Sequence, residues 1–351
     1  MNRKSLVSFV LLAAILAVWA WLVWSRWDKF GELGRVSALA ACALLALAAC
    51  GVVARGLILR AVAAEVGADL PVGEAVNLVA ATTFLNYLPM KAGVGAQTVY
   101  LKRRHRLPYA RFAALFAASY LTQFLAVGVL GVVTSVGLQI TGRGHLGLTI
   151  GSAVFLAACL AVALYPGRWD YRGNSRLLKS VAHGIDSWHA LRGSRALLLR
   201  VGAVQVLLIG VRVVRLHLSF RLLGYADISL PAVLMATLVT FPVHLLSPVP
   251  GSLGLREGAM AWVCAVLGVG WENGFVGATL DRLSIMVVAF TWGGLATVWA
   301  GHLSGRHADG ETGTEARDDA DAENEAEDAP ENEAAGRAPA NDDGETTGAA
   351  N

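Results

Sequence analysis

The sequence predicts an all-α polytopic membrane protein with about six full transmembrane helices, two re-entrant (broken) helical hairpins in an inverted repeat, and a disordered C-terminal tail. Three observations predict this class. Hydrophobic residues make up 55% of the 351 positions and charged residues only 16%, against roughly 25% charged residues in soluble domains. The apolar residues form long runs instead of amphipathic stripes. Two further apolar stretches are interrupted by proline and glycine at matching separations.

Six apolar runs are long enough to cross a bilayer, because a helical crossing needs roughly 20 apolar residues. The first run follows Arg3 and Lys4, so a signal peptide is an alternative for it. We assign it as a span because it is long and lacks a convincing small-residue cleavage site. The runs are Leu6–Trp24, Val36–Leu59, Arg111–Val136, Leu146–Tyr165, Ala196–Leu223 and Phe275–Ala300.

Basic residues cluster in three connecting segments, which the positive-inside rule places in the cytoplasm. These are the N-terminus, the segment 102–106 and the connection 166–195. We therefore expect a multi-pass protein of the cell (inner) membrane, with its N-terminus and C-terminal tail in the cytoplasm.

The stretch 72–101 is predicted to return to the side from which it enters. The second span is expected to end inside at Arg55 and Arg60, and the basic segment 102–106 is also inside. Irregular backbone at membrane depth is tolerated only where it faces protein or a wet cavity. The two pieces of this hairpin, Val72–Leu88 and Gly93–Leu101, are each short for a crossing and are separated by Pro89 and Gly93.

A second interrupted stretch has similar punctuation, but its ends are predicted to lie outside. Its pieces, Leu230–Leu246 and Leu255–Leu267, flank the segment 247–254. Interrupted helices in inverted halves point to a transporter site near the midplane; two unrelated broken segments are the alternative. The matching separations are 16 positions from Arg55 to Pro71 and from Arg215 to Pro231, 18 and 17 from Pro71 to Pro89 and from Pro231 to Pro248, and 6 from Pro89 to Gly95 and from Pro248 to Gly254.

Charge divides the chain into two predicted domains. Of 29 Lys/Arg and 26 Asp/Glu residues, 3 and 15 lie in 302–351, so the membrane domain 1–301 has a net charge of +15. From Asp309 onward the tail has no aromatic residue and no aliphatic residue larger than Ala. It cannot bury enough apolar surface to offset its ordering entropy. The repeat halves are about 36–138 and 196–300.

The second break contains four predicted helix-breaking residues. Pro248, Pro250 and Gly251 interrupt the first half-helix, and Gly254 allows close backbone approach. The first break has Pro89 and Gly93 in the same role.

Charged residues follow the second break at once. Arg256 and Glu257 fall in the first turns of the next half-helix, whose free amide groups and dipole favour an anion. Arg256 suits a lipid phosphate, and Glu257 can orient Arg256 or bind a cationic headgroup or a proton. Asp281 and Arg282 are expected to pair across to them. A structural Arg–carboxylate pair is the alternative, and we favour function because ionisable groups at membrane depth are costly.

Other polar residues fall near the first break or late in apolar runs. Lys91, with Asn86 nearby, is the first-break candidate cation; snorkelling to the interface is its alternative. Arg55, Arg212 and Arg215 fall late in apolar runs. They are expected to line the cavity or to snorkel outward.

The sequence has no catalytic motif that we recognise. A nucleophile elbow, a phosphate-binding loop, paired catalytic carboxylates and a zinc-protease motif are all missing. No metal-ligand spacing is present, and the four cysteines lie in apolar runs without disulfide spacing. We therefore expect no enzyme activity, no cofactor, no metal and no nucleic-acid partner.

The run Pro250–Glu257 reads PGSLGLRE, and Asn86–Gly93 reads NYLPMKAG before the basic Leu101–Arg104. With Gly268 and Arg282, these residues resemble the transmembrane, flippase-like region of lysylphosphatidylglycerol synthases and their stand-alone relatives, over roughly 36–300. This chain differs from many relatives at Val94 and in Ala118–Gln123, where they have an acidic residue and an acidic–arginine pair.

The resemblance implies translocation of a polar-headed phospholipid or glycolipid between leaflets. It does not imply lysyl transfer, because the soluble aminoacyl-transferase domain of the fused members is absent from this sequence. We expect an anionic or zwitterionic lipid as the partner, and the oligomeric state stays open. A small-solute or ion transporter and a non-catalytic membrane partner of a lipid-modifying enzyme, docked through 166–195, are the alternatives. The residues expected at the headgroup are Arg256, Glu257, Arg282, Asp281, Lys91, Asn86 and Arg215.

Overall fold

The computed structural model describes residues 21, 24–25, 37–65, 67–87, 92–105, 107, 109–164, 195–225, 227–246 and 250–301. The chain divides into two units, Met1–Ser304 and Gly305–Asn351, and every described residue belongs to the first. Most of the first predicted span, the connection 166–194 and the tail predicted to be disordered therefore lie outside the described residues.

Five described helices are long and apolar enough to cross a membrane, and they coincide with five of the six predicted runs. The described residues form helices and turns without any strand. The coarse prediction of an all-helical membrane protein is thus confirmed. The five are α3 (Ala38–Glu65), α6 (Tyr109–Ile140), α7 (Leu146–Leu164), α9 (Arg195–Leu222) and α12 (Trp271–Val288), which continues through the π-helical turn η4 (Ala289–Gly293) to Gly301.

Helix α3 continues six residues past the predicted run Val36–Leu59, so Arg55 and Arg60 both lie within it. The helix continues to Glu65, which puts Arg55 ten residues, or about 15 Å along the axis, before its last residue. The alanine-rich residues after Arg60 favour helix, and Val62 and Ala63 are buried. Arg55 is therefore an interior residue of the helix.

Four shorter helices form two contacting pairs. The first pair is α4 (Val72–Leu85) with α5 (Ala92–His105), each of 14 residues. The second is α10 (Leu230–Leu246) with α11 (Leu255–Val266), of 17 and 12 residues. At 1.5 Å per residue, 14 residues extend about 21 Å, which is less than the roughly 30 Å of a hydrocarbon core. Helix α5 starts one residue before the predicted piece Gly93–Leu101 and continues through the basic residues to His105.

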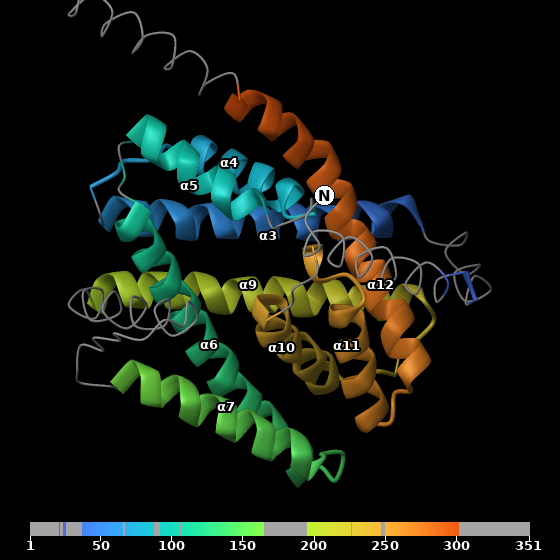
Figure 1. Ribbon diagram of the computed structural model, residues 1–351. Helices are drawn as coiled ribbons and strands as arrows, with labels where there is room; N and C mark the ends of the chain where they lie inside the picture. The colour runs from blue at the N-terminus through green and yellow to red at the C-terminus, as the bar shows by residue number, and fades with distance from the viewer. Residues whose placement is uncertain are drawn as a thin grey trace, which may run out of the picture. The chain divides into compact units, whose positions relative to one another are not determined.

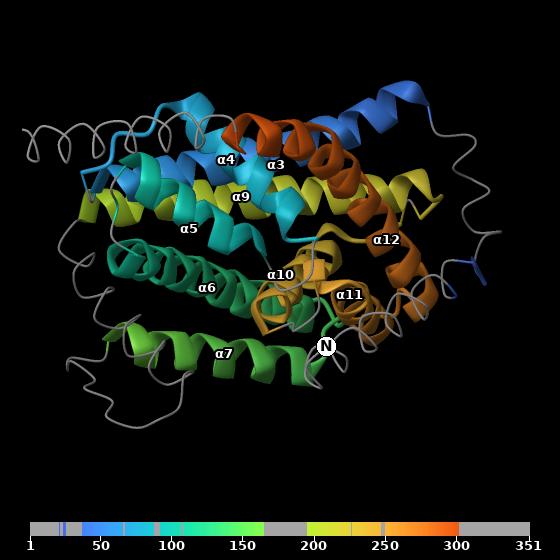
Figure 2. The same cartoon turned by 45° about the horizontal axis from the view of Figure 1, so that its top comes forward.

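The long helices α3 and α9 lie side by side and run in opposite directions (Figures 1 and 2). The α4–α5 pair packs on α3, whereas α10 and α11 contact α9, α6 and α12 between them. Helix α12 touches α3 and α9 as well as α11. The two short pairs thus pack on neighbouring long helices, the first on α3 and the second on α9.

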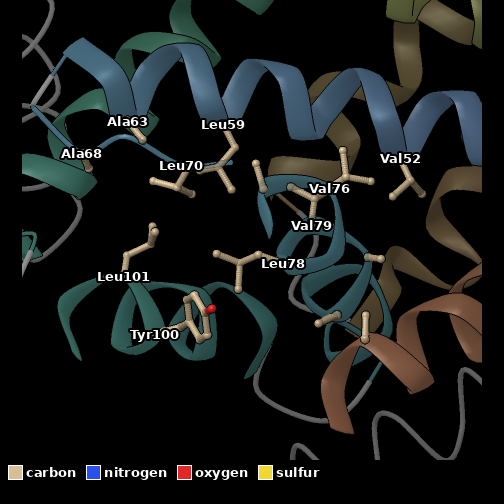
Figure 3. Packing of buried hydrophobic residues seen from close by; sticks show 14 of the residues in the cluster. Val52, Leu59, Ala63, Ala68, Leu70, Val76, Leu78, Val79, Tyr100 and Leu101 are labelled. Carbon is tan, nitrogen blue, oxygen red and sulfur yellow. The ribbon is translucent and has the colours of Figure 1, made fainter. Parts of the chain in front are cut away.

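Buried aliphatic residues join the first short pair to α3 (Figure 3). Leu59 of α3, Leu78 of α4 and Leu101 of α5 belong to one buried cluster. Close approach depends on a glycine, because a Cβ on Gly56 would lie 2.6 Å from Val76 Cγ2. Small residues at helix contacts are typical of membrane proteins, where backbones must approach closely to gain packing energy.

The π-helical turn η4 fixes α4 against the last span. Gly293 faces the α4 backbone, since a Cβ there would lie 2.5 Å from the Ala80 carbonyl oxygen. One residue earlier, the Trp292 Nε1–H donates to Asn77 Oδ1 at 2.9 Å. Such turns occur often at functional sites because they shift the direction of side chains within a helix.

Candidate functional site

The two helix breaks predicted from the sequence meet in the structure. The Gly251 N–H donates to the Asn86 carbonyl oxygen at 3.0 Å, and a Cβ on Gly251 would lie 2.9 Å from Tyr87 Cδ1. The φ angles of Gly251 and Gly254 are 60° and 78°, and Ser252 has a φ of 55°. A non-glycine residue in this region is strained, and such strain clusters at functional sites.

Arg282 and Glu257 form a fully buried ion pair beneath the second break. Arg282 Nε donates to Glu257 Oε1, and the two residues are 1% and 0% exposed. The other Arg282 nitrogens donate to the Gly251 and Ser252 carbonyl oxygens at 2.9 and 3.2 Å. Arg282 therefore fixes the irregular backbone of the break, where free carbonyl groups would otherwise be costly.

Glu257 also caps its own helix. Its Oε2 accepts the N–H of Gly254, the N-cap of α11, at 2.8 Å. The sequence suggested that the start of this half-helix favours an external anion. In the structure, the anion at that position is the chain's own carboxylate. Through its other oxygen, Oε1, Glu257 binds Arg282 of α12.

Asp281 joins three helices through two arginines. Arg215 of α9 donates from Nε to Oδ1 at 2.6 Å and from Nη2 to Oδ2 at 3.3 Å. Arg256 of α11 also donates to Oδ2. The adjacent residues Arg256 and Glu257 thus pair crosswise with Asp281 and Arg282 of α12, as the sequence led us to expect.

A cavity of about 100 Å³ lies between the two breaks. Its wall comes from α3, α4, α9, α10, α11, α12 and the two breaks. Polar groups dominate its named lining, and five of them are arginines. The polar residues are Arg55, Arg212, Arg215, Arg256, Arg282, Asn86, Tyr87, Thr83 and Thr240.

Arg55 and Arg212 belong to this cavity, although the sequence had left them as either cavity or interface residues. Arg55 Nε donates to the Gly51 carbonyl oxygen of its own helix at 3.2 Å. The guanidinium carbon of Arg212 lies 4.5 Å from the centre of the Phe241 ring. One signal was present in the sequence: Arg212 and Arg215 are three residues apart and share a helix face.

Several predicted site residues cannot be placed. Lys91, Pro89 and Pro248 lie outside the described residues, and for Pro250 only the backbone is described, in the turn Pro250–Ser252. Gly93 lies where α4 and α5 converge, since a Cβ there would be 2.2 Å from the Thr82 carbonyl oxygen.

Asn86 is placed at the cavity wall. Within the described part of the chain, its buried Oδ1 has no hydrogen-bond partner. A buried polar atom without a partner is uncommon in native proteins and calls for an explanation.

Together, the apolar spans and the buried ionic cavity define a multi-pass helical membrane protein with a polar site in its interior. The chain belongs to the family described as the lysylphosphatidylglycerol synthase TM region, whose model matches residues 5–293. This confirms the resemblance seen at the two breaks. A protein described as "UPF0104 membrane protein" from Methanothermobacter thermautotrophicus is 32% identical over 89 residues. That match covers 25% of this chain and 25% of the relative.

Proposed function

We propose that this protein is a lipid flippase or translocator that moves the headgroup of a phospholipid or glycolipid between leaflets. The supporting observation is the cavity between the two breaks, whose wall includes five arginines inside a bundle of apolar helices. Ionisable groups within membrane segments are costly and mark substrate pathways. An anionic or zwitterionic headgroup would meet these arginines while its acyl chains stay in the bilayer.

The proposal includes a topology. The pairs α4–α5 and α10–α11 are re-entrant hairpins of an inverted repeat, entered from the cytoplasm and from outside respectively. Short helices in both pairs and the opposite directions of α3 and α9 support it. The basic residues at the end of α5 favour a cytoplasmic location for the feet of the first hairpin. The N-terminus and the tail are then cytoplasmic, in the inner membrane.

The contacts suggest how the cavity would work. The ion pairs of Asp281 and Glu257 fix the wall formed by α9, α11 and α12. Between Asn86 and Gly251, one backbone hydrogen bond joins the two breaks. Opening on alternate sides would therefore break the hydrogen bond between the two breaks and leave the ion pairs of Asp281 and Glu257 intact. The chain has no catalytic or ATPase motif that we recognise, so we propose a non-enzymatic process that is passive, ion-coupled or driven by a partner.

Reconstitution into vesicles tests the proposal. The full-length protein is incorporated into phosphatidylcholine vesicles containing acyl-labelled fluorescent phosphatidylglycerol, and a membrane-impermeant quencher reports the label in the outer leaflet. We expect exchange between leaflets to be faster than in protein-free vesicles. Gly51→Leu should slow it, because Gly51 lines the cavity, whereas Gly210→Leu, at an exposed helix position with open space, should not.

Equal rates in protein-containing and protein-free vesicles would refute lipid translocation. Uptake of a polar solute by the same vesicles, without lipid movement, would favour a small-solute transporter. Loss of a co-purifying enzyme on deletion of the connection 166–194, with Gly51→Leu harmless, would favour a membrane partner of that enzyme.

A further inference from the structure

The charges at the cavity do not balance. Among the described residues, five arginines line it and the carboxylates in contact with them are Asp281 and Glu257, which leaves a formal charge of +3 on this part of the wall. In an apolar bundle an uncompensated charge is expensive, because little water is available to solvate it. The excess positive charge on the cavity wall therefore favours binding of an anion in the cavity.

Three of the five arginines are already neutralised or engaged. Arg215 and Arg256 share Asp281. Arg282 uses Nε for Glu257 and its other nitrogens for two backbone carbonyl groups. Carboxylates of the protein therefore hold all three of these side chains in place.

The other two arginines differ. In the described part of the chain, neither Arg55 nor Arg212 lies within ion-pair distance of a carboxylate. Arg55 has a hydrogen bond from Nε to its own helix, which leaves its two terminal nitrogens to donate elsewhere. Arg212 has its guanidinium over the Phe241 ring, a contact that stabilises a cation and leaves the in-plane N–H donors of the guanidinium free.

We propose that Arg55 and Arg212 bind a phosphate group, and that the other three arginines build the wall of its site. Two guanidinium groups lining one cavity match a phosphate mono- or diester, whose oxygens accept paired hydrogen bonds. The inference rests on the proposed function for the source of that phosphate, a membrane lipid. The uncharged polar residues Asn86, Thr83 and Thr240 on the same wall suit hydroxyl groups of the headgroup.

This assignment reverses the roles expected from sequence. Arg256 and Arg282 were the expected headgroup contacts, but their partners are carboxylates within the protein. Arg55 and Arg212 supply two of the three uncompensated positive charges, and the third is shared by Arg215 and Arg256 around Asp281. The two groups of arginines should therefore respond differently to substitution, since one group stabilises the empty protein and the other stabilises only the loaded one.

Thermal unfolding of the full-length protein in a neutral detergent tests the assignment. The probes are dioleoyl phosphatidylglycerol, dioleoylglycerol as the same chains without phosphate, and inorganic phosphate. We expect the phospholipid to raise the Tm of the wild type. Arg55→Gln and Arg212→Gln should each weaken its apparent affinity about 10- to 100-fold, the loss expected for charge-assisted hydrogen bonds. Arg200→Gln, at an exposed position of α9, should leave it unchanged.

A second readout separates ligand binding from a structural role. Without lipid, Arg55→Gln and Arg212→Gln should leave the Tm unchanged or raise it, because each removes an unpaired charge. Arg282→Gln should lower it, because Glu257 then lies buried without its partner. The assignment is overturned if Arg55→Gln or Arg212→Gln destabilises the empty protein as much as Arg282→Gln does. It is also overturned if dioleoylglycerol protects as well as the phospholipid, or if the Arg55→Gln/Arg212→Gln protein binds phospholipid like the wild type.

The two proposals can fail separately. If inorganic phosphate competes fully with the phospholipid and no lipid moves in vesicles, the phosphate site stands and lipid translocation is refuted. If the Arg55→Gln/Arg212→Gln protein moves fluorescent phosphatidylglycerol at the wild-type rate, translocation stands and the phosphate site is refuted. Protection by phosphatidylglycerol but not by inorganic phosphate supports a lipid source.

Discussion

The two short helix pairs have their ionic contacts at opposite ends. In α4–α5 the ionic contacts lie at the feet of the pair, that is, at the start of α4 and the end of α5. Glu74 of α4 accepts hydrogen bonds from Tyr100 at 2.9 Å and from Arg104 at 3.2 Å. It also contacts His105 Nε2 at 2.7 Å. In α10–α11 the ionic contact lies at the break itself, where Glu257 of α11 binds Arg282 of α12. The second break is thus a rigid frame, and the first is positioned against it by neutral contacts.

That difference gives the cavity one charged wall that is held firmly and one wall, at the first break, that is held only by neutral contacts. Residues of the second break have their irregular backbone bonded by Arg282. The first break contributes Asn86 and Tyr87, which reach the frame through a backbone hydrogen bond and ring packing. The Tyr87 ring lies 5.7 Å from that of Phe290, between centroids. Substitutions in the frame should therefore cost far more stability than substitutions in the first break.

The largest effect is expected for Glu257→Gln. It leaves Arg282 buried without a carboxylate, and breaking a buried pair from one side costs about 3–5 kcal/mol. Unfolding of the purified protein, followed by denaturant titration or thermal scanning, measures the loss. In the Glu257→Gln/Arg282→Gln protein no charge is unpaired, so much of the loss should be recovered. A double variant less stable than either single variant would show that an unpaired buried charge is not the cause of the loss.

Gly251→Ala tests the junction between the two breaks and should cost about 2 kcal/mol. A side chain at its φ of 60° is strained by about 1–2 kcal/mol, and the new Cβ would meet the Tyr87 ring. Adding Tyr87→Ala should relieve the clash but not the strain. For Gly210→Ala, in a helix with open space around it, no loss is expected. A Gly251→Ala protein as stable as that control would disprove the close approach of the breaks.

The sequence predicted five of its spans and the two helix breaks well, because both depend on local properties. Apolar run length sets a span, and glycine and proline mark where helix must stop, as at Gly251 and Gly254. Pairing of Arg256 and Glu257 with α12 was also expected. The sequence did not predict which arginines lack a carboxylate partner, because that depends on which carboxylate each side chain reaches in the folded protein. Arg55 was expected late in an apolar run, as either a cavity or an interface residue, and only the packing of α3 against α4 and α9 places it at the cavity.

Glu74→Gln tests the feet of the first pair and should cost about 1 kcal/mol, since Arg104 is partly exposed and exposed pairs contribute little. Burial alone would raise the pKa of Glu74, but the hydrogen bonds from His105 and Tyr100 and the charges of His105 and Arg104 outweigh it and lower the pKa below its ordinary value.

A lowered carboxyl pKa gives this prediction a pH dependence. The stability that Glu74 contributes is fully present above its unfolded pKa of about 4.3 and is lost as the pH falls through the lower folded value. The stability difference between wild type and Glu74→Gln should therefore shrink below about pH 4. Glu65→Gln, at an exposed position of α3, is the matched control and should show no such difference. A Glu74→Gln effect that is constant between pH 3 and pH 7 would rule out an ionic role.

The smallest effect is expected at the contact between η4 and α4. Trp292→Phe removes the hydrogen bond to Asn77 Oδ1 while keeping most of the aromatic surface, so the loss should be about 0.5–1.5 kcal/mol, the net value of one hydrogen bond. Trp262→Phe is the matched control, because the Trp262 side chain is 53% exposed. Equal Tm values for the two variants would show that the bond contributes nothing to stability. If only Trp292→Phe also slows lipid exchange in vesicles, the junction that positions α4 acts on the first break, since Phe84 of α4 and Tyr87 both pack on Phe290 of the same turn.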